Sequence, residues 1–98
     1  MLQGRRVAMK SILLTEYMSY RTKRRNYDFD LLEQVIRFST EKYFDTETGR
    51  TVAVGRHREK LVLIPYDEDE STITPVTVHA TTRQQVSLRV NTGRFKPL

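Results

Sequence analysis

Apolar residues recur at helical spacing in the first third of the chain. Over residues 11–25 they are spaced by three and four positions without an intervening Gly or Pro, which predicts an amphipathic helix. Its apolar stripe would consist of Ile12, Leu13, Tyr17 and Tyr20. A second helix follows, because Asp28 or Asp30 can cap it. Its apolar stripe would consist of Phe29, Leu32, Val35 and Ile36.

The apolar period then changes from near 3.6 to about 2, which is typical of strands. Residues 42–45 and 51–54 predict a hairpin around a turn at residues 46–49, where Gly49 would take a positive φ. A second turn is expected at residues 55–59.

Two further strands are predicted beyond this turn. Residues 61–66 form an apolar run suited to the middle of a sheet, although Pro65 lacks an N–H and predicts a bulge or a strand end. Residues 72–79 alternate apolar side chains with threonines, broken at Pro75, and predict the fourth strand.

The last element has clear start and stop signals. Thr82 and Gln85 make a capping box, Val86 and Val90 mark an apolar face, and Gly93 follows as a C-terminal stop. We therefore expect an α+β fold with two N-terminal helices, a four-stranded, mainly antiparallel sheet and a short C-terminal helix. All 98 residues would form one domain, with residues 1–9 and 95–98 frayed.

Composition restricts the chemistry. The chain has no cysteine, which excludes disulfides and thiolate metal sites, and its two histidines, His57 and His79, are too few for a typical zinc site. We therefore expect neither a metal nor another cofactor. The longest apolar runs have three or four residues, far fewer than the roughly 20 that span a bilayer. No signal-peptide pattern is complete, so the expected location is the cytoplasm.

The net charge of +5 is unevenly distributed. Residues 1–25 hold seven Lys or Arg and one Glu, residues 26–78 hold six basic and eleven acidic side chains, and residues 79–98 hold four basic side chains and no acid. Both ends are therefore basic and the centre is acidic. This distribution favours a polyanionic partner, above all RNA.

The basic residues near both ends are the candidates for contacts to RNA phosphates. They are Arg21, Lys23, Arg24, Arg25, Arg89 and Arg94. The first four have a simpler interpretation, because cations in the last turns of a helix stabilise its dipole. The two interpretations are compatible. The acidic run at residues 67–70 is interpreted as a solvated turn, since it lacks the spacing of a calcium loop.

The common catalytic motifs for nucleotides, serine nucleophiles and zinc are missing from the sequence. Metal-free RNA cleavage remains, which requires proton transfer and neutralisation of charge at phosphorus. The candidates are His79, Tyr66, Lys60 and Arg83, at the ends of the last predicted strands and in the first turn of the closing helix.

Each candidate also has a structural interpretation. His79 would be a strand-end histidine bonded to a backbone carbonyl, and Tyr66 would belong to the rim of the core. Arg83 is less easily explained, because a cation in the first turn opposes the helix dipole and calls for another partner. The turn residues Arg56 and His57, with Arg58, could be a functional cluster or only solvated charge.

Several segments together resemble the small BrnT-like proteins of the RelE/ParE toxin superfamily. They are residues 15–18, Arg21, residues 24–28 before a helix that ends near Arg37, and residues 43–45, 49–50, 61–66 and 73–79, with the closing segment 82–95. The resemblance implies a RelE/ParE-like fold and a metal-independent mRNA endonuclease of a bacterial toxin–antitoxin pair, neutralised by a cognate antitoxin. Carried over by position, it implies catalytic roles for Arg50, Lys60, Tyr66, His79 and Arg83.

The leading expectation is therefore an RNA-cleaving toxin that inhibits translation. Two alternatives remain open at this point. The first is a non-catalytic RNA- or ribosome-binding module in which the same cations only hold phosphates. The second is a protein-binding domain whose basic face receives an acidic partner.

Overall fold

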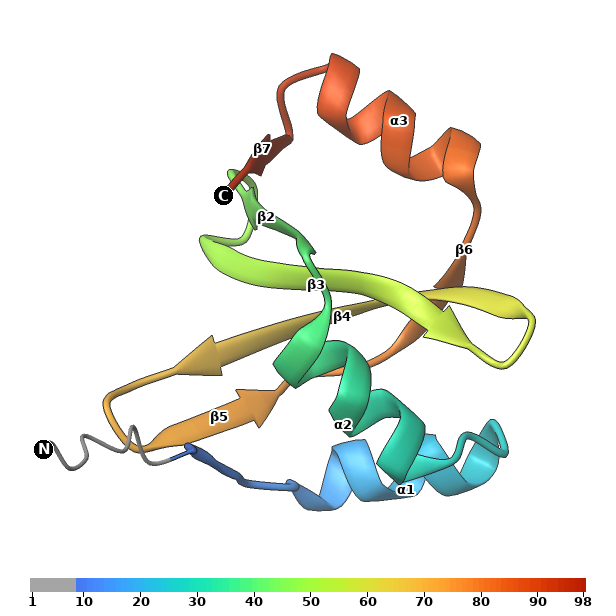
Figure 1. Ribbon diagram of the computed structural model, residues 1–98, viewed down its shortest axis with the longest axis vertical. Helices are drawn as coiled ribbons and strands as arrows, with labels where there is room; N and C mark the ends of the chain where they lie inside the picture. Colours follow the sequence, from blue (N-terminus) through green and yellow to red (C-terminus); the bar gives the residue numbers. More distant parts are fainter. Residues whose placement is uncertain (1–8) are drawn as a thin grey trace, which may run out of the picture.

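The computed structural model describes residues 9–98, which form three helices and a seven-stranded mixed sheet (Figure 1). In chain order the elements are β1 (Ser11–Ile12), α1 (Glu16–Arg24), α2 (Phe29–Phe38), β2 (Glu41–Asp45), β3 (Arg50–His57), β4 (Lys60–Glu68), β5 (Thr72–Pro75), β6 (His79–Thr81), α3 (Arg83–Asn91) and β7 (Phe95–Pro97). No helix of residues 9–98 is long and apolar enough to cross a membrane.

The strands lie in the order β1-β5-β4-β3-β2-β7, and β6 also pairs with β4, beyond the end of β5. β1 runs parallel to β5, whereas the other ladders are antiparallel. The predicted RelE/ParE-like fold with a four-stranded, mainly antiparallel sheet is therefore wrong, because the sheet is mixed and has seven strands. The strands β1, β6 and β7 have only two or three residues, too few for a period of two to be visible in the sequence.

β4 is buried on both faces, so it separates two apolar layers. Val62, Ile64 and Tyr66 face the layer that holds α1 and α2, whereas Leu61 and Leu63 face the layer that holds α3. Figure 1 shows the two N-terminal helices on one side of the central strands and α3 on the other. Because β4 is covered on both faces, its apolar residues form a continuous run instead of alternating with polar ones.

The first helix differs from its prediction. It begins at Glu16, with Thr15 as its N-cap, so Ile12 and Leu13 lie outside it. The predicted apolar stripe is wrong, because Tyr17 and Tyr20 are 55% and 59% exposed. The helix buries Met18 and Thr22 instead. The Thr22 hydroxyl can be buried because it donates to the carbonyl of Met18 at 2.8 Å.

The predicted fourth strand is divided into β5 and β6, which both pair with β4. The chain leaves the sheet between Pro75 and His79, and within this segment the N–H of Val76 donates to the carbonyl of Pro65 at 2.8 Å. A strand residue directs its N–H and C=O to the same side, so the ring nitrogen of Pro65 faces this interruption. Within residues 9–98, no strand lies there that would need a hydrogen bond from residue 65. Pro65 therefore neither ends nor bulges β4.

The β2–β3 turn is confirmed, with Gly49 at φ +74°. The predicted second turn at residues 55–59 begins too early, because β3 continues to His57. Gly55 therefore lies within a strand, and a Cβ there would come within 2.9 Å of the Val35 side chain. The missing side chain lets α2 pack closely on β3.

The helix caps agree with the sequence. Asp28 caps α2 by accepting from the N–H of Asp30, and Thr82 caps α3 by accepting from the N–H of Gln85. The expected fraying of residues 95–98 is wrong, because β7 pairs with β2 and Phe95 is only 2% exposed. Fraying is also expected at the N-terminus, residues 1–9, but residues 1–8 lie outside the described residues.

Candidate functional site

The structure does not bring the five predicted catalytic residues to one place. Lys60 pairs with His57 at the turn of the β3–β4 hairpin. Arg50 and Tyr66 lie at the opposite end of the same hairpin, where Thr51 pairs with Tyr66. Seven residues of extended strand separate the two ends, which is roughly 23 Å. Lys60 and Arg50 therefore do not act on one phosphate.

Tyr66 is a core residue. Its side chain is 3% exposed in the layer with α1 and α2, and the ammonium of Lys42 lies 5.9 Å from its ring centre. Burial and the nearby charge of Glu68 raise the pKa of the Tyr66 hydroxyl. The structural interpretation of Tyr66 therefore describes its position, and its hydroxyl is poorly placed for proton transfer to a substrate.

Arg83 has the partner that its position calls for. Its guanidinium donates to Glu41 at 2.6 Å, and the hydroxyl of Tyr43 donates to the same carboxylate at 2.7 Å. Burial acts to raise the pKa of Glu41, but these hydrogen bonds outweigh it and hold the pKa below its ordinary value. Burial and the bond to Glu41 raise the pKa of Tyr43 to about 12.

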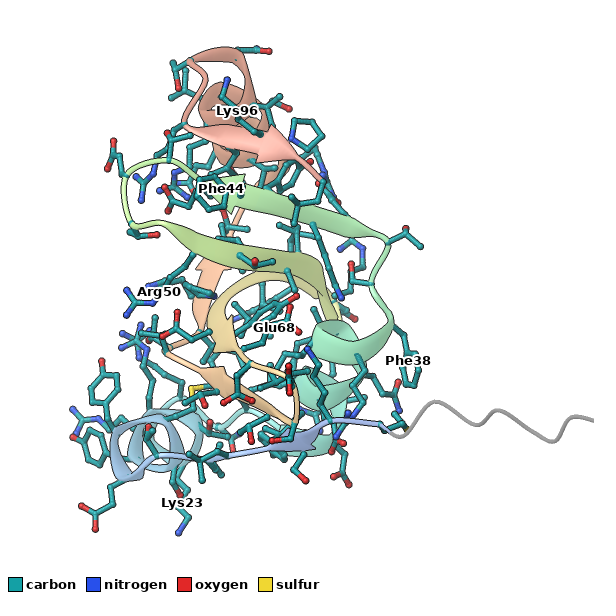
Figure 2. The ribbon with its side chains drawn as sticks, turned by 90° about the vertical axis from the view of Figure 1, so that its left-hand side faces the viewer. Lys23, Phe38, Phe44, Arg50, Glu68 and Lys96 are labelled. Atoms are coloured by element: carbon teal, nitrogen blue, oxygen red, sulfur yellow. The ribbon has the colours of Figure 1, made fainter. Side chains whose placement is uncertain are left out.

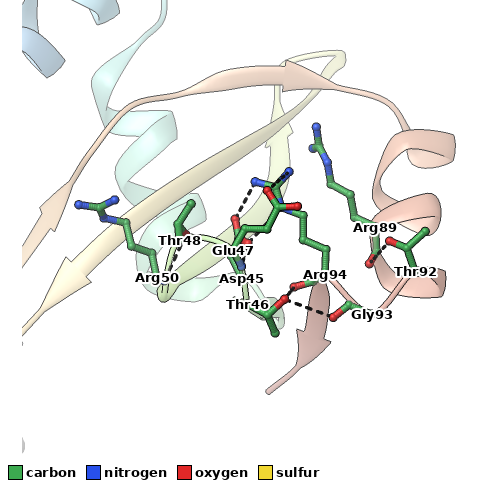
Figure 3. Close-up of polar contacts among 9 residues, drawn as sticks. All are labelled: Asp45, Thr46, Glu47, Thr48, Arg50, Arg89, Thr92, Gly93 and Arg94. Atoms are coloured by element: carbon green, nitrogen blue, oxygen red, sulfur yellow. Dashed lines mark hydrogen bonds and ion pairs between the residues drawn. The ribbon is translucent and has the colours of Figure 1, made fainter.

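Arg50 and Arg94 also have acidic partners. Arg50 pairs with Asp67 at 3.1 Å. Arg94 donates two hydrogen bonds of 3.0 Å to Asp45, which is 4% exposed, and lies 3.4 Å from Glu47 (Figure 3). Dashed lines in Figure 3 join Arg94 to Asp45, whereas none joins the guanidinium of Arg89 to another residue drawn. Arg94 thus holds β7 and the β2–β3 turn together.

His79 is in a different setting, at the exposed start of β6. A terminal guanidinium nitrogen of Arg21 lies 3.2 Å from Nδ1 of His79, and Nε of Arg21 donates to the carbonyl of Val78 at 2.9 Å. Guanidinium groups only donate, so Nδ1 is the acceptor and the proton of the neutral ring is on Nε2. The expected bond from His79 to a backbone carbonyl is absent among the hydrogen bonds of residues 9–98.

The pKa of His79 lies below its ordinary value. Partial burial of the ring is the largest cause, and the positive charge of Arg21 is the next. Arg89 on α3 and Arg25 at the end of α1 act in the same direction. Arginines from the two opposite layers of the fold therefore surround one imidazole.

Exposed tyrosines extend this cluster along α1. Tyr17, Tyr20, Arg21 and Arg24 occupy positions i, i+3, i+4 and i+7 of the helix, so they share one face. Arg24 donates to the Tyr20 hydroxyl at 3.3 Å. Lys23 lies elsewhere on α1 and points away from the sheet (Figure 2). We call the following group the basic surface: Tyr17, Tyr20, Arg21, Arg24, Arg25, His79 and Arg89.

The arginines of the basic surface lack the acidic partners that most other arginines of residues 9–98 have. Among residues 9–98, Lys10, Arg37, Arg50, Arg58, Arg83 and Arg94 form ion pairs with Asp or Glu. The four arginines of the basic surface form none there. Arg89 instead lies 5.6 Å from the ring centre of Phe95.

The sequence pattern does not identify Tyr17 and Tyr20 as site residues, because aromatic side chains at helical spacing predict a buried stripe. Their interleaving with Arg21 and Arg24 is the signal that distinguishes an exposed face from a buried one. Within the described part of the chain no group of three or more His, Asp or Glu side chains is arranged to hold a metal ion.

Comparison with known proteins gives no relative. Neither a family model, nor a curated protein, nor a solved structure matches this chain.

Proposed function

We propose that this chain binds single-stranded RNA through the basic surface. The observation that carries the proposal is a group of four arginines without acidic partners among residues 9–98, which come from α1, its C-cap and α3. Three of them, Arg21, Arg25 and Arg89, act on His79. Cations that no internal acid neutralises are available to phosphates, which supply most of the affinity in such complexes.

The exposed tyrosines favour RNA with unpaired bases over a duplex. Tyr17 and Tyr20 are more than half exposed beside Arg21 and Arg24, and aromatic rings next to guanidinium groups are the platforms on which unpaired bases stack. His79 adds a neutral donor, since its Nε2–H is left for a phosphate or base once Nδ1 accepts from Arg21. The surface therefore combines charge, stacking and hydrogen bonding.

The salt dependence of binding tests the proposal. Four phosphate contacts predict a slope of log K against log salt of about −3 for single-stranded RNA, and loss of one contact should reduce the slope by about 0.7. Fluorescence anisotropy with a labelled single-stranded RNA, in EDTA, would compare the wild type with Arg25→Gln and Arg89→Gln.

Arg50→Gln is the matched control, because it removes the same charge from a residue outside the basic surface. The proposal predicts weaker binding and a shallower slope for Arg25→Gln and Arg89→Gln only. Equal losses in Arg50→Gln would mean that net charge, rather than this surface, binds the RNA.

A second candidate is the metal-independent mRNA endonuclease of a toxin–antitoxin pair. It is favoured by one observation, that the proton-transfer candidate His79 lies within the basic surface. The binding proposal comes first because Arg21 occupies Nδ1 and leaves Nε2 protonated, which suits donation to a phosphate better than abstraction of a proton. A cognate antitoxin would then be expected to cover the same surface.

The two candidates differ in what happens to the RNA. An endonuclease would produce RNA fragments in EDTA and arrest growth on induced expression, and His79→Ala would abolish both. A binding protein would retain the RNA uncut with the steep salt dependence. Intact RNA under conditions where the anisotropy shows saturation would exclude the nuclease.

A further inference from the structure

A pocket of about 360 Å³ opens between two turns, away from the β2–β7 side of the sheet. One turn joins α1 to α2, and the other joins β3 to β4. The lining residues are Arg25, Asn26, Tyr27, His57, Arg58, Glu59 and Lys60. Apart from Arg25, none belongs to the basic surface, so the pocket is a separate feature that borders it.

Both turns contain a residue in the left-handed region of backbone conformation. Asn26 has a φ of +60° and Arg58 has a φ of +58°. Asn adopts this region more readily than most residues, whereas for Arg it is uncommon. Residues held in such conformations cluster at ligand sites. Here both residues belong to the lining of the pocket.

His57 supplies a buried donor to this pocket. Its side chain is 5% exposed, its ring packs edge-on against Tyr27 at 5.0 Å, and its Nε2 accepts from the backbone N–H of Asp28 at 2.8 Å. Because Nε2 is the acceptor, the proton of the neutral ring is on Nδ1.

The Nδ1–H of His57 has no hydrogen-bond partner within residues 9–98. Within residues 9–98, Oγ1 of Thr77 is the fully buried side-chain N or O atom that lacks a hydrogen-bond partner. Nδ1 of His57 lacks a partner too but is not fully buried, so it remains accessible. The ring lines the pocket, and we infer that Nδ1–H is accessible from it. A buried donor of this kind is normally satisfied by a partner, which here must come from outside residues 9–98.

The charge of the lining indicates the chemistry of that partner. Arg25, Arg58 and Lys60 contribute three positive charges against the one negative charge of Glu59, a net of +2. Arg58 also approaches Asp28, but at 3.7 Å and with an exposed side chain. We propose that this pocket binds a phosphate group, which accepts a hydrogen bond from Nδ1–H of His57 and is neutralised by Arg25, Arg58 and Lys60.

The phosphate could be inorganic, part of a nucleotide or the 5′ end of an RNA. The full-length chain would be titrated with inorganic phosphate and with adenosine 5′-monophosphate at constant ionic strength, with chloride as the reference anion. Long-range ¹H–¹⁵N NMR would follow the imidazole of His57. We expect a saturable shift of the Nδ1 resonance with phosphate or with the nucleotide, and none with chloride.

Two substitutions at exposed positions test the cations without disturbing the core. Lys60→Ala removes an ammonium, and Arg58→Asn removes a guanidinium while keeping a residue that tolerates the left-handed conformation. Each should weaken phosphate binding about tenfold, as loss of a charge-assisted hydrogen bond does. Lys96→Ala on β7 is the matched control and should leave the affinity unchanged.

Paired RNAs with a 5′-phosphate or a 5′-hydroxyl distinguish the sources. A preference for the phosphorylated RNA that Lys60→Ala abolishes assigns the pocket to an RNA end. Equal binding of both RNAs, with the His57 shift retained, assigns it to a free phosphate compound. The proposal is overturned when neither phosphate nor nucleotide shifts His57, or when Lys96→Ala weakens binding as much as Lys60→Ala. RNA affinity itself is measured separately, so failure of the basic surface would be recognised independently.

Discussion

The guanidinium of Arg21 on α1 lies 3.2 Å from Nδ1 of His79 on β6. These residues are 58 positions apart in the sequence, and Arg21 also binds the Val78 carbonyl beside the histidine. The contact attaches the first helix to the edge of the sheet. It also fixes the tautomer of His79, since an arginine cannot accept a hydrogen bond.

The titration of His79 should report this contact. Burial and neighbouring arginines lower its pKa in the folded chain, so ¹H–¹⁵N NMR should give a midpoint below 6.5. Arg21→Gln should raise the midpoint, because one of the named charges is removed.

The sign for stability follows from the direction of the shift. At pH values between the lowered pKa of His79 in the folded chain and 6.5, the unfolded chain binds more protons than the folded chain. The free energy of unfolding therefore rises with pH across this window, and the contribution of His79 is complete above pH 6.5. Chemical denaturation at several pH values would measure the slope, which should be shallower in His79→Gln. A midpoint at or above 6.5 in the wild type would contradict the role given to the arginines.

Base stacking should depend on Tyr20. Stacking of one base contributes about 1–3 kcal/mol, so Tyr20→Ala should weaken binding of single-stranded RNA at least about fivefold, and Tyr20→Phe should retain most of the affinity. Fluorescence anisotropy at one salt concentration is sufficient. Phe38→Ala is the control, because Phe38 is 67% exposed on α2, outside the basic surface. Similar losses in both alanine variants would argue against stacking on α1.

The buried carboxylate of Asp45 should matter more for stability than the exposed carboxylate of Asp67. Asp45 is 4% exposed and accepts two hydrogen bonds from Arg94 and one from the N–H of Glu47. Asp45→Asn should therefore reduce the free energy of unfolding by about 2 kcal/mol. Asp67→Asn breaks only an exposed pair with Arg50, and such pairs contribute from about 0 to 1 kcal/mol. Urea denaturation of both variants measures the difference.

Asp45 also predicts a pH effect in acid. Burial acts to raise its pKa, but the bonds from Arg94 and Glu47 outweigh it, and the folded value lies below 3.8. The stabilisation is therefore complete above about 4 and is lost as the pH falls through the folded value. In Asp45→Asn the loss of stability below pH 4 should be smaller than in the wild type. If Asp45→Asn and the wild type lost stability equally below pH 4, Asp45 would not be the cause of the acid destabilisation.

Close packing of α2 on β3 should require Gly55. A Cβ at this position would lie 2.9 Å from the Val35 side chain, so Gly55→Ala should destabilise the fold by about 1–3 kcal/mol. In the double variant Gly55→Ala with Val35→Ala the two changes should partly compensate, giving a coupling energy that a double-mutant cycle measures. Strictly additive effects would show that Val35 does not cause the strain.

The parts of the fold that could be predicted from the sequence depend on local signals. The Gly49 turn and the caps of α2 and α3 need only a few neighbouring residues, and each was found where expected. The strands β1, β6 and β7 depend on pairing with distant segments, so two or three residues of sequence carry no signal for them. The strand number therefore could not be obtained without the tertiary structure.

The candidate site shows the same division. The excess of Arg near both ends was visible, but the sequence could not separate cations with an acidic partner from those without one. Arg83 pairs with Glu41 across 42 positions, and Arg94 pairs with Asp45 across 49. The burial of Tyr66 and His57 likewise follows from the sheet register, which local patterns do not specify.

Because β4 lies between the two apolar layers, the proposed RNA-binding surface depends on both of them. Met18 anchors α1 in one layer and Val86 anchors α3 in the other, so the arginines around His79 are assembled only when both layers are closed over the same strand. Local melting of either helix would disperse the site before the sheet is lost. If RNA contacts arginines from both helices, it should slow hydrogen exchange in α1 and α3 together, because opening of either helix would then require loss of bound RNA.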